Sequence, residues 1–137
     1  MPYWKLYYHF IWGTKNHLPL ITATLEPDIY RAIAAKAQQM GGVVHAIGGI
    51  EDHVHLAVSV PPSLALARFI GDVKGNSSHY INYAVRPGFG FHWQDEYGVF
   101  SVGEKNLPVV VRYIHNQKQH HAQGTIIAAM ERLDSTG

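Results

Sequence analysis

Two histidines separated by a single residue, His53 and His55, form the pair of side chains in this sequence most suited to metal chemistry. Residues 54–60 alternate between apolar and small or polar side chains, which predicts a β-strand whose alternate side chains share a face. The two imidazoles would lie about 7 Å apart at Cα, given a rise of about 3.3 Å per residue. Such a pair can bind one metal ion and leave positions open for a substrate, although two ordinary surface histidines would share the pattern.

A second pair, Tyr113 and Gln117, lies four residues apart in a helix predicted over residues 107–121. A phenol hydroxyl can attack phosphorus in an activating environment, and a glutamine carbonyl is a hard oxygen ligand suited to Mg²⁺ or Mn²⁺. Two imidazoles and this carbonyl would hold such an ion loosely and leave positions for phosphate oxygens. An all-histidine zinc site that includes His120 or His121 is the alternative on the same helix.

Further polar residues flank both pairs. Asp52 directly precedes His53, where its carboxylate would either orient the imidazole or close the preceding turn. Lys74, Ser77 and Ser78 offer hydrogen-bond donors for a phosphate, and they could equally form a solvated helix face.

These residues must be positioned by a chain of 137 residues, which suits one domain spanning residues 1–137. The sequence contains no cysteine, so disulfides, thiolate metal sites and cysteine nucleophiles are excluded. A net charge of +1 makes no case by itself for nucleic acid. The sequence has neither an apolar run of the ~18 residues that a membrane span needs nor a signal-peptide pattern at its start, so we expect no membrane association and a cytoplasmic location.

The predicted elements alternate between strands and helices in an α+β order. The expected strands are residues 4–12, 43–47, 54–60, 91–94 and 99–102, and the expected helices are residues 26–40, 64–83, 107–121 and 125–133. This order matches the ferredoxin-like or RRM-like arrangement, an antiparallel sheet with helices on one face. An additional C-terminal helix would carry the tyrosine.

Taken together, the motifs resemble the single-tyrosine transposases of the insertion-sequence two-hundred/six-hundred-five type, often called TnpA, which belong to the HUH endonucleases. The resemblance covers nearly the whole chain, and the segments that carry it are residues 14–15, 52–56, 74–78, 93–102 and 113–121. The histidine pair alone is a weak signal, whereas the complete set in this order is specific.

The resemblance implies a concrete chemistry. His53, His55 and Gln117 would bind Mg²⁺ or Mn²⁺, and Tyr113 would attack a phosphate of single-stranded DNA to give a 5′-phosphotyrosine bond. The expected partners are the DNA hairpins at the ends of a mobile element and a second copy of the chain in a homodimer. DNA contacts are expected from Lys15, Lys74, Ser77, Ser78 and Arg112, and supporting contacts to the metal ligands from Asp52, Asn116 and His120.

Two other functions are compatible with the residues. One is a single-strand nucleic-acid-binding module, such as a domesticated transposase, that stacks bases on Tyr7, Trp93 and Tyr97. The other is a zinc hydrolase built on His53, His55 and His120.

Overall fold

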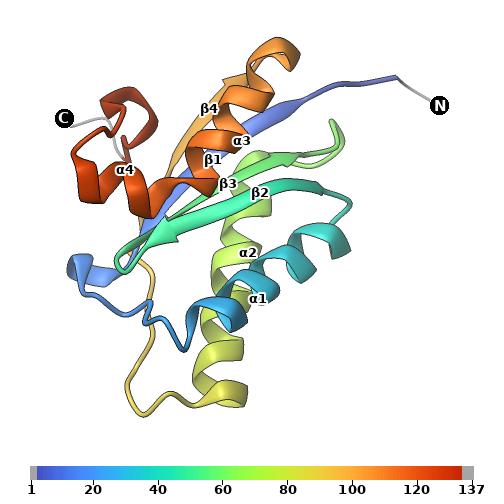
Figure 1. Ribbon diagram of the computed structural model, residues 1–137. Helices are drawn as coiled ribbons and strands as arrows, with labels where there is room; N and C mark the ends of the chain where they lie inside the picture. Colours follow the sequence, from blue (N-terminus) through green and yellow to red (C-terminus); the bar gives the residue numbers. More distant parts are fainter. Residues whose placement is uncertain (1–2, 134–137) are drawn as a thin grey trace.

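The computed structural model describes residues 3–133, which form a four-stranded antiparallel sheet with helices on both faces (Figure 1). The strands are β1 (Tyr7–Gly13), β2 (Val43–Ile50), β3 (His53–Ser59) and β4 (Gly98–Val102). Their order in the sheet is β2-β3-β1-β4, so β3 and β1 are the central strands. Gly13 lies opposite His53 and Ile11 opposite His55 in the register of this central pair.

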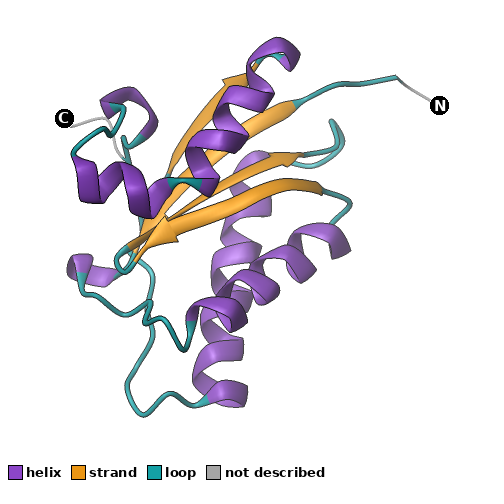
Figure 2. Ribbon diagram, in the orientation of Figure 1, coloured by secondary structure: helices purple, strands orange, loops and turns teal. Residues whose placement is uncertain are grey.

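Helices α1 (Glu26–Gln39) and α2 (Leu66–Tyr80) cover one face of the sheet, and α3 (Leu107–His115) covers the other (Figure 2). Helix α4 (Gln117–Gln123) follows α3 after a break at Asn116. The element order and the strand order confirm the ferredoxin-like fold. Helices α1 and α2 are the pair that the prediction placed on one face of the sheet. Helix α3 covers the opposite face.

Alternation along the strands sorts the side chains onto these two faces. The larger core, between the sheet and α1 and α2, contains from the central strands Phe10, Trp12, Val54, Leu56 and Val58. On the opposite face a smaller cluster joins Ala46 and Ala57 of the sheet to Val110 and Ile114 of α3. Because fully burying a large apolar side chain contributes about 1.5–3 kcal/mol, these two α3 residues stabilise the helix on the sheet, and Leu107 and Val111 of α3 add partly buried contacts.

The structure differs from six of the expected elements. Strand β1 starts at Tyr7 instead of residue 4, and β2 ends at Ile50 instead of residue 47. The helix predicted over residues 107–121 is broken at Asn116 (φ −104°, ψ 23°), a residue type whose short polar side chain competes with helical hydrogen bonds. Residues 91–94 form no strand and contribute an isolated bridge between Trp93 and Thr14. The helix predicted over residues 125–133 is a short 3₁₀ turn, Ala128–Met130. Helix α2 starts at Leu66 and continues as a π-helical turn over Ile81–Val85.

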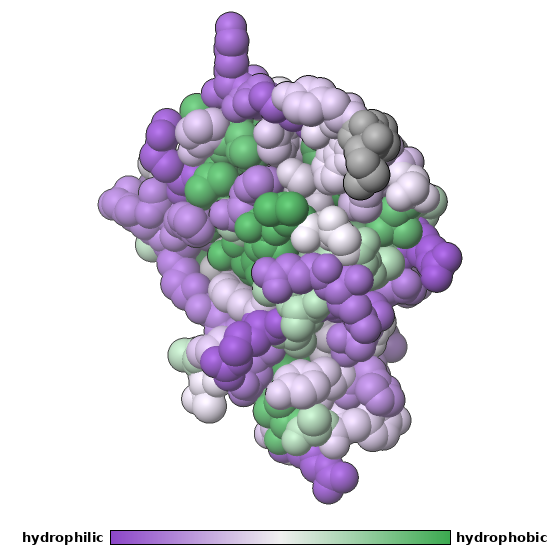
Figure 3. Space-filling view, turned by 90° about the vertical axis from the view of Figure 1, so that its right-hand side faces the viewer, coloured by the Kyte–Doolittle hydropathy of each residue, from purple (hydrophilic) through white to green (hydrophobic). Residues whose placement is uncertain are grey.

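The face of the molecule seen in Figure 3 is mostly hydrophilic, with hydrophobic residues gathered in separate patches. Every helix within residues 3–133 is too short or too polar to span a membrane.

Candidate active site

The histidine pair lies on the sheet face that α3 covers. His53 is 8% exposed and His55 is fully buried, with their ring centroids 5.2 Å apart. The alternation of β3 was predicted correctly, but the face that carries the histidines is not an open polar surface. Every residue of β3 is buried, because the second face of the sheet is covered as well as the first.

Each histidine has a hydrogen-bond partner for its Nδ1 atom. Nδ1 of His53 lies 2.8 Å from the Asp52 carboxylate, and Nδ1 of His55 lies 2.8 Å from Nε2 of His9. Burial, followed by the neighbouring His55, lowers the pKa of His9 to about 3, so His9 is neutral and can accept the hydrogen bond. A proton held on Nδ1 leaves the lone pair of Nε2 available to a metal ion, which is the usual arrangement of histidine ligands.

Tyr113 and Gln117 approach the histidine pair within the same chain. The amide oxygen of Gln117 lies 3.3 Å from Nε2 of His53, and the ring of Tyr113 lies 5.8 Å from that of His55. Both side chains are nearly completely buried. They belong to different helices, α3 and α4, and both side chains face the histidine pair across the break at Asn116.

Glu131 completes this cluster, and the sequence pattern did not single it out. Its Oε1 atom lies 3.1 Å from Nε2 of both His53 and His55. Its Oε2 atom accepts hydrogen bonds from the Tyr113 hydroxyl and, at 3.3 Å, from the Gln117 amide. Glu131 stands 76 residues from His55 in a segment predicted only as a further short helix, so the folded chain is needed to reveal the contact.

The electrostatics of the cluster follow from burial and from these hydrogen bonds. Burial opposes ionisation of Glu131, but hydrogen bonds from His53 and His55 outweigh it and lower the pKa of the carboxyl. Burial alone would lower the pKa of His53, whereas its contacts with Glu131 and Asp52 raise it overall. Burial, together with the hydrogen bond to Glu131, raises the pKa of the Tyr113 phenol. The phenol is therefore protonated near neutral pH and faces an ionised carboxylate.

The donor atoms suit a divalent cation. Ligand atoms of His53, His55 and Glu131 lie within 4.8 Å of one another, and the Gln117 oxygen adjoins them. Two imidazole nitrogens with amide and carboxylate oxygens are compatible with Mn²⁺ or Mg²⁺.

His120 does not lie with the histidine pair. Its ring stacks on Tyr113 at a centroid distance of 4.7 Å, and its Nδ1 bonds to the Thr125 hydroxyl. His121 is nearer, with its ring 4.9 Å from that of His53. The zinc site built with His120 is therefore not assembled in this structure, whereas Nε2 of His121 lies 3.5 Å from the same Glu131 oxygen that contacts His53 and His55.

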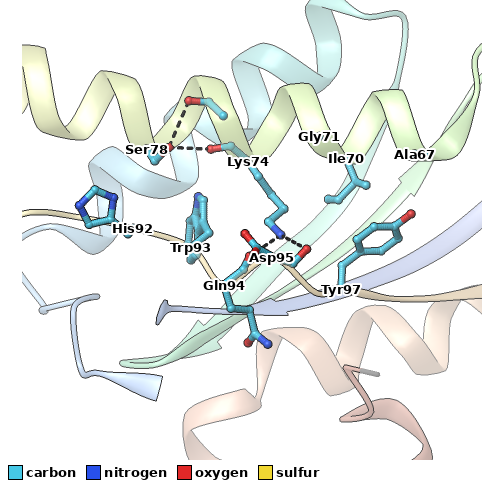
Figure 4. Close-up of a pocket in the computed structure, with 11 residues that line it drawn as sticks. Ala67, Ile70, Gly71, Lys74, Ser78, His92, Trp93, Gln94, Asp95 and Tyr97 are labelled. Carbon is cyan, nitrogen blue, oxygen red and sulfur yellow. Dashed lines mark hydrogen bonds between the residues drawn. The ribbon is translucent and has the colours of Figure 1, made fainter. Parts of the chain in front are cut away.

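Three of the expected DNA contacts, Lys74, Ser77 and Ser78, are engaged within the protein beside a pocket of about 310 Å³ between α2 and residues 92–97 (Figure 4). The Lys74 ammonium donates to the main-chain oxygens of residues 94–96, with the shortest distance, 2.6 Å, to Gln94. The buried Ser77 hydroxyl donates to the Lys74 carbonyl and accepts from the Trp93 indole, and the Ser78 hydroxyl also donates to the Lys74 carbonyl. Lys74 and Ser77 thus hold the 92–97 segment against α2, whereas Ser78 bonds only within the helix.

The remaining sequence-predicted residues are separated from one another. Lys15 and Arg112 are exposed, so their charges are accessible to a partner. Asn116 is exposed at the break between α3 and α4, whereas Asp52 contacts His53 directly.

Comparisons with known proteins bear on both the fold and the cluster. Residues 2–117 match the family model described as IS200-like transposase, a range that includes Tyr113 and Gln117 but not Glu131. The ISDra2 transposase TnpA of Deinococcus radiodurans is 31% identical over 122 residues, which are 83% of this chain and 85% of that protein.

Two solved structures share the fold. A protein of Deinococcus radiodurans R1, crystallised as a candidate transposase, has a TM-score of 0.66 and 25% identity, covering 85% of this chain and 95% of that one. A REP-associated tyrosine transposase bound to a REP hairpin has a TM-score of 0.65 and 14% identity, covering 92% of this chain and 76% of that one.

Proposed function

The chain belongs to the IS200-like transposase family and is a DNA transposase, and from this premise we propose that it cleaves and rejoins single-stranded DNA through a covalent bond to Tyr113. His53, His55 and Gln117 would bind the divalent ion, Mg²⁺ or Mn²⁺, that the reaction uses. The whole catalytic unit would be the single domain of residues 1–137.

One observation carries the proposal. The Tyr113 hydroxyl and the Nε2 atoms of both histidines contact the same carboxylate from opposite sides. A nucleophile and two metal-ligand atoms are thus separated by the width of one small oxyanion. A phosphate group of DNA could bridge the same gap.

The proposed step conserves the phosphoester. The Tyr113 oxygen attacks phosphorus and gives up its proton, the bond from phosphorus to the 3′-oxygen breaks, and a 3′-hydroxyl is released. The new 5′-phosphotyrosine bond retains the energy of the original one, so a second 3′-hydroxyl can displace the tyrosine and rejoin DNA without ATP. A bound divalent ion supplies neutralisation of the charge that develops on the phosphate oxygens.

The protein groups around the reacting atoms have distinct tasks. Asp52 and His9 hold the two imidazoles with Nε2 toward Glu131, where the phosphate would bind. The α3 residues Val110 and Ile114 fix the tyrosine backbone on the sheet. The main-chain amide of Ile127 lies 3.0 Å from the Tyr113 oxygen and donates to it.

We propose a DNA hairpin as the partner and a homodimer as the working assembly. The REP-associated tyrosine transposase, which shares the fold, was solved with a REP hairpin, and this supports the choice of a folded single strand as ligand. Arg112 and Lys15 are the exposed cations nearest in sequence to the proposed tyrosine and to the end of β1, and both are candidates for backbone contacts.

The test is the formation of a covalent adduct. Labelled single-stranded DNA from the regions that flank the protein's own gene is incubated with the protein and Mg²⁺ or Mn²⁺, and the products are separated under denaturing conditions. The wild-type protein should form an adduct that Tyr113→Phe abolishes. The matched control is Tyr83→Phe, an exposed tyrosine in the π-helical turn that follows α2, which should leave the adduct unchanged. Adduct formation by Tyr113→Phe, or none by the wild type with any flanking strand, would refute the proposal.

A further inference from the structure

We propose that in the DNA-free protein the Glu131 carboxylate coordinates the divalent ion at the position that the scissile phosphate later takes, and that DNA displaces it. This inference rests on the proposed function, because it assigns a further ligand to the same metal site. It goes beyond the family pattern, since Glu131 lies outside the residues that match the family model.

The contacts of the two carboxylate oxygens support this role. Oε1 is equidistant, at 3.1 Å, from the Nε2 atoms of His53 and His55, so it lies where one ion would meet both imidazoles. Oε2 receives the hydrogen bond of the Tyr113 hydroxyl. If Tyr113 attacks a phosphorus atom whose oxygen binds the ion, that phosphate must lie between the phenol and the imidazoles, which is where the carboxylate lies.

Chemistry and access lead to the same conclusion. Carboxylate and phosphate oxygens are both hard, anionic ligands that suit Mg²⁺ and Mn²⁺. The side chains of His53 and Glu131 are only 10% and 14% exposed, so the carboxylate blocks the approach to the histidine pair. A phosphate can reach that pair only after Glu131 has moved away.

The segment that carries Glu131 lies against the sheet face through neighbouring residues as well as through the carboxylate itself. The Ile127 amide donates to the Tyr113 oxygen, and Met130 packs against the small cluster beneath α3. The main-chain oxygen of Arg132 lies so close to Gly98 that a methyl group at that position would collide with it. A short 3₁₀ turn that lies outside the larger core can leave the sheet without unfolding that core.

Manganese binding tests the proposal directly. Mn²⁺ is titrated by calorimetry into the full chain without DNA, comparing the wild type with Glu131→Gln, which keeps the shape of the side chain and removes its charge. We expect the dissociation constant to rise on the order of tenfold or more. Glu104→Gln is the matched control, because Glu104 is an exposed glutamate paired with Lys5. This variant should bind Mn²⁺ with the affinity of the wild type.

A second variant displaces the segment and leaves Glu131 in place. Gly98→Ala introduces a methyl group against the Arg132 carbonyl, and it should weaken Mn²⁺ binding in the same direction as Glu131→Gln. Gly103→Ala is its control, because a Cβ at Gly103 meets open space. In both cases a thermal melt checks that the protein is folded.

Inorganic phosphate tests the displacement. Phosphate should bind the Mn²⁺-loaded Glu131→Gln variant more tightly than the Mn²⁺-loaded wild type, because the competing carboxylate has gone. Equal phosphate affinity in the two proteins would refute the proposal that the Glu131 carboxylate and the phosphate take the same position on the ion.

A His53→Ala variant separates the two hypotheses. If His53→Ala loses Mn²⁺ binding while Glu131→Gln binds as the wild type does, Glu131 is not a ligand and the proposed function stands. If folded His53→Ala binds Mn²⁺ normally, the metal site itself is wrong and both proposals fail.

Discussion

The buried hydrogen bond between His9 and His55 determines which nitrogen of His55 is available to a metal ion, and replacing His9 measures its contribution. His9 is 2% exposed, its Nε2 lies 2.8 Å from Nδ1 of His55, and the two rings stack with centroids 5.0 Å apart. His9→Phe keeps a ring in this position and removes the acceptor. The proton of His55 can then move to Nε2, the atom that faces Glu131.

The magnitude follows from the burial of His55. A metal ion that binds Nε2 in the variant must force the proton back to Nδ1, where the N–H has no acceptor and is shielded from water. An unsatisfied buried donor costs about 1–3 kcal/mol, which corresponds to a rise of about 5- to 140-fold in the dissociation constant. Loss of such supporting partners costs metal sites about 10- to 100-fold, a range consistent with this estimate.

The assay is calorimetric titration of Mn²⁺ into wild type, His9→Phe and His9→Gln. His9→Gln offers an amide oxygen as acceptor, so it should recover most of the affinity that His9→Phe loses. His79→Phe makes the same exchange on an exposed surface of α2 and should bind Mn²⁺ as the wild type does. A folded His9→Phe variant with wild-type affinity would refute the reasoning, because the hydrogen bond would then have no influence on the ligand.

Three further predictions concern the site and its support. Gly48→Ala directs a methyl group into the main-chain oxygen of Ile114, so it should lower the free energy of unfolding by about 1–3 kcal/mol in urea denaturation and reduce the Tyr113 adduct; unchanged stability would mean that α3 shifts freely. Ser77→Ala removes the acceptor 2.9 Å from the Trp93 indole nitrogen and should cost about 1–3 kcal/mol by the same measurement, with the half-buried Ser78→Ala as the milder comparison. The raised pKa of His53 means that protonation stabilises the metal-free fold below about pH 6.5, and this contribution is lost as the pH rises through the folded-state pKa. Because a proton and Mn²⁺ compete for the same imidazole, Mn²⁺ affinity should instead weaken as the pH falls through that pKa. A dissociation constant for Mn²⁺ that does not depend on pH would contradict this prediction.

Periodicity alone predicted the parts of the fold in which local pattern and tertiary packing agree. The alternation in β3 placed Val54 and Leu56 in the core and both histidines on the other face. Pro27 in its first turn and Gly41 (φ +90°) beyond its end bounded α1. These signals are local, so the sequence contains them in full.

The parts of the site that depend on long-range contacts could not be derived in the same way. Glu131 reaches the histidines from a segment that the sequence predicted as a helix with no link to the site, and the burial of His55 results from elements more than fifty residues away. Lys74 and Ser77 read as open hydrogen-bond donors in the sequence, because the partners that occupy them, Gln94 and Trp93, are set by the path of a loop. The catalytic role of Tyr113 stays a prediction until the adduct experiment is done.

The break at Asn116 divides the proposed reaction between two short helices that rest on one sheet through different residues. Tyr113 is anchored by the α3 residues Val110 and Ile114, whereas Gln117 opens α4, whose Lys118 bonds to the main-chain oxygen of Gly49 at the end of β2. A DNA end joined to Tyr113 would thus be tethered to the sheet through α3, with the Gln117 amide held beside it by a separate support.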